Sequence, residues 1–66
     1  MEFKIYVYIK PLTDEHLIYK TFTAAERACR IGGLIEEWIC TEDSERFRVL
    51  NVWERTIEGF TSIFSS

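Results

Sequence analysis

The sequence is poor in the residues that catalysis, metal binding and disulfide formation require. Among its 66 residues are one histidine, two cysteines, three glycines and one proline. No nucleophile motif accompanies His16, and the spacing of His16, Cys29 and Cys40 fits no zinc site. Gly32-Gly33 lacks the lysine of a phosphate-binding loop. We therefore expect no enzymatic activity, no metal and no cofactor.

Long apolar runs are also missing. No stretch approaches the roughly 18 apolar residues of a membrane-spanning helix, and residues 1–6 lack the basic and apolar regions of a signal peptide. We expect a cytoplasmic protein with reduced, buried cysteines. On one continuous helix Cys29 and Cys40 would lie about 16 Å apart, too far to pair, whereas a break at Gly32-Gly33 leaves a disulfide open.

Positive charge is scarce. Eight Lys and Arg against eleven Asp and Glu give a net charge of −3, so direct nucleic-acid binding, which depends on clustered cations, is not the leading expectation. The alternation of residues 3–10 places Tyr6 and Tyr8 with Lys4 on the predicted outer face of a strand. Weak stacking of bases on this face stays open as a second alternative function.

The remaining composition is that of a small folded domain. Hydrophobic residues make up 47% of the chain and aromatic residues 15%. We expect one α+β domain over residues 1–66, with residues 56–66 as an extra strand or a tail. A chain of this size buries only about 60% of its unfolded surface, so a homodimer or a bound partner would help to complete its core.

Alternating patterns predict three or four strands. Residues 3–10 and 17–22 are expected to pair as an antiparallel hairpin, since Pro11 ends the first strand. Residues 46–55 form the next predicted strand, and residues 60–64 a last one after a turn at Glu58-Gly59. The predicted fold is β-β-α-β(-β), with one helix packed on a small, mainly antiparallel sheet.

The predicted helix begins at a capping box. In such a box the Thr23 hydroxyl accepts from the Glu26 N–H, and the Glu26 carboxylate accepts from the Thr23 N–H. Helical periodicity then continues to Ile39 or Cys40. Each glycine of Gly32-Gly33 costs about 1 kcal/mol inside a helix, so we expect either one bent helix or two short ones.

A second apolar stripe lies beside the buried face of this predicted helix. It consists of Ile31, Leu34 and Trp38. The two stripes together span roughly 220° of the helix, more than a single sheet covers. Either the C-terminal segment or another protein is expected to cover the excess.

Acidic residues crowd the end of the predicted helix and the loop after it. Such charge is either a solvated face or a rim that pairs with a basic partner. In the second case the candidate partner site consists of Ile31, Leu34, Trp38, Glu36, Glu37, Glu42 and Asp43. Truncating Trp38 to Ala is then expected to weaken binding by ~2 kcal/mol or more and to leave folding intact.

A hairpin, a helix opened by FTAAERACRI and a strand with RFRVLNVWER follow one another along the chain. This organisation, over residues 3–55, resembles that of tiny phage-encoded proteins such as the podophage RNA-polymerase inhibitor and several anti-CRISPR proteins. The resemblance includes no shared motif. It implies a non-enzymatic inhibitor, in the host cytoplasm, that occludes a surface of a host or defence nucleic-acid-processing complex. The alternative is a homodimeric structural or accessory protein.

Overall fold

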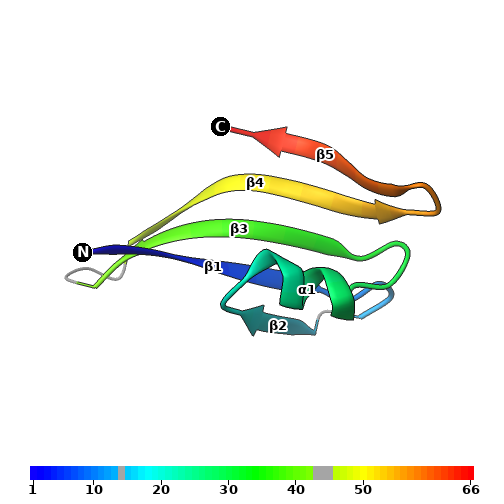
Figure 1. Ribbon diagram of the computed structural model, residues 1–66, viewed down its shortest axis with the longest axis horizontal. Coiled ribbons are helices and arrows are strands. Elements are labelled where there is room, and N and C mark those ends of the chain that lie inside the picture. The colour runs from blue at the N-terminus through cyan, green and yellow to red at the C-terminus, as the bar shows by residue number, and fades with distance from the viewer. Residues whose placement is uncertain (14, 43–45) are drawn as a thin grey trace.

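Five antiparallel strands and one short helix make up the structure. The computed structural model describes residues 1–13, 15–42 and 46–66. The elements, in chain order, are β1 (Glu2–Ile9), β2 (His16–Tyr19), α1 (Phe22–Ala28), β3 (Leu34–Thr41), β4 (Phe47–Thr56) and β5 (Gly59–Ser65). The strands form one sheet in the order β2-β1-β3-β4-β5, and α1 lies on one side of it (Figure 1).

The α+β class is confirmed, while the predicted order of elements is matched only in part. β1 and β2 form the predicted antiparallel hairpin, with Val7 opposite Ile18. β4 corresponds to the strand predicted at residues 46–55. The C-terminal residues form β5, which pairs with β4 across a two-residue turn at Ile57 and Glu58. The difference is β3, which stands where the sequence predicted a helix.

The helix α1 begins slightly earlier and ends much earlier than predicted. Its N-cap is Thr21, whose hydroxyl accepts a hydrogen bond from the Ala24 N–H at 3.2 Å. The predicted capping box at Thr23 and Glu26 is wrong, because Thr21 offers the same type of side chain two residues earlier. With seven residues, α1 falls far short of the length of a membrane-spanning helix, and the described residues form no other helix.

The glycine pair before β3 explains why the helix does not continue. Gly32 has a φ of +90°, a left-handed conformation that side chains rarely adopt. A Cβ on Gly33 would lie 2.6 Å from the Tyr8 ring, so the ring occupies the space that a side chain would need. The chain reverses at these two residues, and residues 34–41 extend as β3 between β1 and β4. Both helical alternatives for this segment, one bent helix or two short ones, are therefore wrong.

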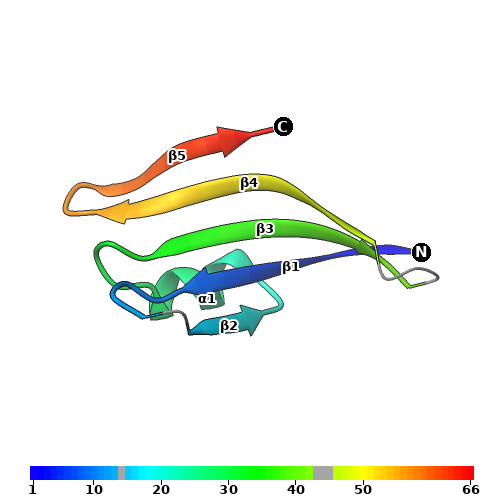
Figure 2. The ribbon, with the colours of Figure 1, turned by 180° about the vertical axis from the view of Figure 1, so that it is seen from behind.

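The sheet has two unlike faces, because side chains alternate along each strand. α1 packs against β1, β2 and β3 on what we call the covered face. Figure 2 shows the other side, the open face, which none of the described elements covers. The strand register assigns to the open face Phe3, Ile5, Val7 and Ile9 of β1, His16 and Ile18 of β2, Leu34, Glu36, Trp38 and Cys40 of β3, Phe47, Val49, Val52, Glu54 and Thr56 of β4, and Thr61 and Phe64 of β5.

The core lies between α1 and the covered face. Its buried members are Tyr8, Ala25, Cys29 and Ile35. The small side chains of α1 allow the helix backbone to approach the sheet closely. Beside them, the Phe22 ring packs edge-on against Trp53 and Phe60 of β4 and β5, with ring centroids 4.9 and 5.7 Å away. Through Phe22, the short helix thus also contacts β4 and β5.

The predicted outer face of β1 is wrong, because Tyr6 and Tyr8 point toward α1. Tyr8 is 1% exposed, and its hydroxyl accepts a hydrogen bond from the Arg30 N–H at 3.1 Å. The Tyr6 ring lies 6.0 Å from that of Phe22. Tyrosine combines a large apolar ring with a hydroxyl that needs a hydrogen-bond partner. The core beneath α1 buries the Tyr8 ring, and the Arg30 N–H is the partner of its hydroxyl. The Tyr8 ring therefore offers no surface on which a base stacks.

Candidate functional site

Exposed apolar side chains from four strands gather on the open face. Phe3, Ile18, Phe47 and Phe64 are between 44 and 67% exposed. Half-buried apolar residues lie between them, while Val7, between Ile18 and Glu36, is packed by its neighbours to 2% exposure. Apart from the acidic residues, the open face is therefore predominantly apolar. Soluble monomers rarely expose large apolar patches, and where such patches occur they commonly mark interaction sites. The open face is therefore the candidate functional site.

An aromatic stack stands on this face where β3 and β4 pair. The rings of Trp38 and Phe47 lie 4.1 Å apart and within 10° of parallel. The Trp38 indole N–H donates a hydrogen bond to Glu36 Oε1 at 2.9 Å. The stack and the hydrogen bond together hold the indole in one orientation. Rigid, partly exposed aromatic rings are frequent anchors in protein interfaces.

A carboxylate occupies the middle of the open face. β3 is the central strand of the five, and Glu36 lies opposite Val7 of β1 and Val52 of β4. The same row continues to Ile18 on β2 and Phe64 on β5. Apolar side chains thus flank Glu36 on both sides to the edges of the sheet. The site is an apolar surface with a negative charge at its centre.

The neighbouring acid, Glu37, points to the covered face and is held by partners within the protein. Its carboxylate accepts hydrogen bonds from the Tyr6 hydroxyl at 2.8 Å and the Asn51 amide at 2.7 Å, and the Lys4 ammonium lies 3.8 Å away. Burial by itself raises the pKa of Glu37, but these three partners outweigh burial and hold the pKa below its ordinary value of 4.5. Burial and the adjacent carboxylate raise the pKa of Tyr6.

Three residues of the predicted partner site do lie together. Leu34, Glu36 and Trp38 are alternate residues of β3 and share the open face. Their proximity has a different cause from the predicted one, because the segment is a strand and not a helix. Alternate residues share a face of a strand, whereas residues three and four apart share a face of a helix.

The other four predicted residues are separated from these three. Glu37 lies on the covered face, and it is 8% exposed. Ile31 is exposed in the loop before β3, and Glu42 is exposed beyond the opposite end of the strand. Asp43 falls outside the described residues. The predicted stripe and rim therefore do not form one continuous site, since an extended strand places its two ends far apart.

Sequence reasoning missed Phe3, Phe47 and Phe64 as members of the site. The signal for Phe3 is the alternation of apolar residues along residues 3–9, and that for Phe47 is the presence of apolar residues on both faces of residues 46–55. Phe64 lies in the C-terminal segment that the sequence predicts as a strand or a tail. For residues 3–9 the pattern predicts that the side with Phe3 faces the core, because the side with Tyr6 and Tyr8 is predicted as the outer face. Only the position of α1 decides which side is covered.

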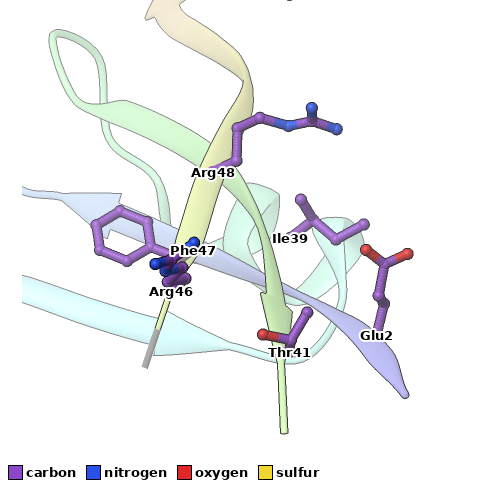
Figure 3. Close-up of a pocket in the computed structure, with 6 residues that line it drawn as sticks. All are labelled: Glu2, Ile39, Thr41, Arg46, Phe47 and Arg48. Carbon is purple, nitrogen blue, oxygen red and sulfur yellow. The ribbon is translucent and has the colours of Figure 1, made fainter. Parts of the chain in front are cut away.

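A shallow hollow of about 380 Å³ lies on the covered face, at the end of the sheet away from α1. It is lined by Glu2, Ile39, Thr41, Arg46, Phe47 and Arg48. Figure 3 shows Arg48, Ile39 and Glu2 on one side of the sheet, with the Phe47 ring directed away from them. None of the lining side chains is buried. Specific small-molecule sites bury most of their ligand. This hollow is therefore a weaker candidate site than the open face.

The two cysteines are free thiols, so the disulfide that a break at Gly32-Gly33 left open is not formed. Cys29 is buried at the C-cap of α1, and Cys40 lies near the end of β3. Burial raises the pKa of the Cys29 thiol, although the Arg55 charge partly opposes this. Within residues 1–13, 15–42 and 46–66, no three His, Cys, Asp or Glu side chains are grouped as metal ligands.

Comparison with known proteins returned no relative. No protein-family model, curated protein or solved structure matches the chain. The open face and its central carboxylate are therefore the observations from which a function is inferred.

Proposed function

We propose that the chain is a non-enzymatic protein-binding module that contacts its partner through the open face. The observation that supports this most strongly is the set of exposed apolar side chains that four strands place on the open face, Phe3, Ile18, Phe47 and Phe64. A sheet normally buries its apolar face against a second layer of structure. None of the described residues supplies that layer on this side, and the partner would do so.

The dimensions of the sheet fit a protein interface. The molecule measures 39 × 22 × 19 Å, and its two longer dimensions run along and across the strands (Figure 1). Their product, about 850 Å², is an upper bound on the projected area of the open face, because β2 and β5 are shorter than β4. Each partner contributes ~800 Å² to an interface of standard size. A partner would therefore have to cover most of the open face to form an interface of standard size.

The anchors of this interface would be the stacked Trp38 and Phe47, with Leu34 on the same face of β3 beyond Glu36. Trp38 and Leu34 belong to the site predicted from the sequence, and Phe47 is added by the strand register. Aromatic side chains that are already ordered lose little conformational entropy on binding. The stack would thus contribute more binding free energy per unit of buried area than flexible side chains do.

The finer prediction concerns what the partner is. That it is a host or defence complex, blocked by a phage-encoded inhibitor, rests on the resemblance in organisation over residues 3–55 and stays a prediction. The alternative of a homodimeric accessory protein also stays a prediction. Both use the same face, and the oligomeric state distinguishes them.

Affinity capture with matched variants tests the proposal. The double variant Ile18→Thr/Phe47→Thr removes two exposed apolar side chains from the open face and keeps residues that favour strands. Ile57→Thr is the control, because Ile57 is 86% exposed in the β4–β5 turn. Proteins captured from a cell lysate, measured by quantitative mass spectrometry, should be retained by the control and lost with the double variant. Equal capture by both variants would show that the open face is not used.

A further inference from the structure

We infer that the open face binds a basic amphipathic helix, which places a Lys or Arg from its apolar side against Glu36. This inference rests on the proposed function and specifies the chemistry of the partner. It follows from where the one central charge of the face lies and from the charges that surround it.

Apart from His16 at the β2 edge, the charged side chains of the open face are acidic. Glu36 lies at its centre and Glu54 one row further along β4, opposite Leu34. None of the strand residues assigned to this face is Lys or Arg. Cations of the neighbouring strands point to the covered face: Lys4 pairs with Glu37, and the Arg55 guanidinium lies 5.2 Å from the centre of the Phe60 ring. The face therefore complements a partner that brings positive charge.

The Glu36 carboxylate also retains capacity to accept hydrogen bonds. Among the described residues, the Trp38 indole N–H is the one group that donates to it, and it does so to Oε1. A partner that covered this face with apolar atoms alone would bury a carboxylate without a counter-charge, which is strongly unfavourable. A Lys or Arg at the middle of the partner's apolar surface removes that cost and forms a charge-assisted hydrogen bond.

A second copy of the chain fits this face less well. Two copies that overlap fully are related by a twofold axis, and such an axis brings equivalent residues near its centre together. Because Glu36 is central, the two carboxylates would meet within an apolar interface. Like charges in that position oppose association.

A helix fits the dimensions of the face. With its side chains an α-helix is about 10–12 Å across, and fifteen residues extend about 22 Å. Both lengths lie within the 39 × 22 Å of the molecule in the plane of the sheet. The covered face already packs a helix, so a helix on the open face would complete a three-layer arrangement with the sheet in the middle.

Selection from a display library of randomised fifteen-residue helical peptides tests the inference. The baits are the wild-type chain, Glu36→Gln and, as a control with the same change in net charge, Glu54→Gln. Peptides enriched on the wild type and on Glu54→Gln should carry a Lys or Arg between apolar positions. Peptides enriched on Glu36→Gln should keep the apolar positions and lose the basic one. A peptide selected on the wild type should bind Glu36→Gln at least roughly tenfold more weakly.

The outcomes separate this inference from the proposed function. Two results would overturn the inference alone, for peptides that lose binding to Ile18→Thr/Phe47→Thr. One is that the selected peptides show no enrichment of basic residues. The other is that they bind Glu36→Gln as tightly as the wild type. A stable dimer of the wild type in light scattering, dissociated by the same double variant, would also overturn it and would identify a second copy as the occupant. Peptides whose binding ignores the double variant would overturn both.

Discussion

Tyr6 and Glu37 lie opposite each other on β1 and β3, and the Tyr6 hydroxyl donates a 2.8 Å hydrogen bond to the Glu37 carboxylate. Asn51 donates to the other carboxylate oxygen from β4 at 2.7 Å. Three adjacent strands are thus joined through one acidic side chain on the covered face. This network gives the first two predictions, which concern the stability of the sheet.

Replacing Tyr6 with Phe should lower the free energy of unfolding by about 1–2 kcal/mol. The substitution keeps the ring against Phe22 and removes one donor from a carboxylate that is 8% exposed. Urea unfolding monitored by circular dichroism measures the change. Tyr19→Phe is the control: the Tyr19 hydroxyl makes no hydrogen bond within the described residues, so its loss should change stability by less than about 0.5 kcal/mol.

The stability of the chain should fall in acid because of Glu37. Its pKa is lower in the folded chain than the ordinary 4.5, so its contribution is fully present above that value and is lost as the pH falls through the folded-state pKa. Urea midpoints measured from pH 7 to pH 2 should therefore decrease below about pH 4.5. Glu37→Gln should be less stable than the wild type at pH 7 and should show a flatter acid limb. An unchanged acid limb in this variant would contradict the assignment.

Gly33→Ala should destabilise the chain by about 1–3 kcal/mol, as overpacking in a core does. The new Cβ would lie 2.6 Å from the Tyr8 ring and 3.1 Å from the Arg30 carbonyl oxygen, and neither atom is free to move far. Gly32→Asn provides the comparison, because Asn tolerates the left-handed conformation better than most residues. Thermal unfolding should rank the variants with Gly33→Ala lowest. The opposite ranking would mean that the turn, and not the contact with Tyr8, limits stability.

The open face should bind hydrophobic dyes in the free protein. The fluorescence of anilinonaphthalene sulfonate should decrease with Ile18→Thr/Phe47→Thr and change little with Ile57→Thr, which lies outside this face. The double variant loses the ring stack with Trp38, which is worth about 0.5–1.5 kcal/mol beyond the area that it buries, so its free energy of unfolding should fall by about 1–3 kcal/mol. Unchanged dye fluorescence would mean that the face is already covered in solution.

The two thiols should differ in reactivity. Cys29 is buried, and burial raises its pKa, so little reactive thiolate is present near pH 8. Cys40 is half-buried in β3. In Cys40→Ser, the remaining thiol should react with a disulfide reagent at least tenfold more slowly than the thiol of Cys29→Ser, as timed by mass spectrometry. Similar rates would indicate that α1 opens readily.

Local patterns were sufficient to predict the hairpin and the β4 strand. Residues 3–10 alternate between apolar and polar or aromatic side chains, and Pro11 ends the pattern, so no competing helical period exists there. Residues 46–55 carry apolar residues on both faces, as expected of a strand with neighbours on both sides. In residues 3–10 the two-residue period and Pro11 both indicate a strand that ends at a turn.

Residues 34–41 could not be assigned from local pattern, because they satisfy both periods. Ile35 and Ile39 are four apart, as on a helix, while Leu34, Glu36 and Trp38 alternate with them, as on a strand. The assignment depends on long-range contacts: the Tyr8 ring occupies the space at Gly33, and β1 offers a free edge for pairing. The apolar arc of roughly 220° is itself evidence against a helix, since strands that pack on both faces are commonly apolar on both.

The central position of β3 has a consequence for the order of folding. β1 pairs with β2, and β4 with both β3 and β5, through connections that are short in sequence, but Tyr6 and Glu37, which join β1 to β3, are 31 residues apart. Closing that loop costs more chain entropy than forming any of the hairpins. We therefore expect residues 1–20 and 34–66 to collapse as two local units, whose docking across β1 and β3 limits the folding rate. The open face would form as a continuous surface only in that last step, after both halves of it exist.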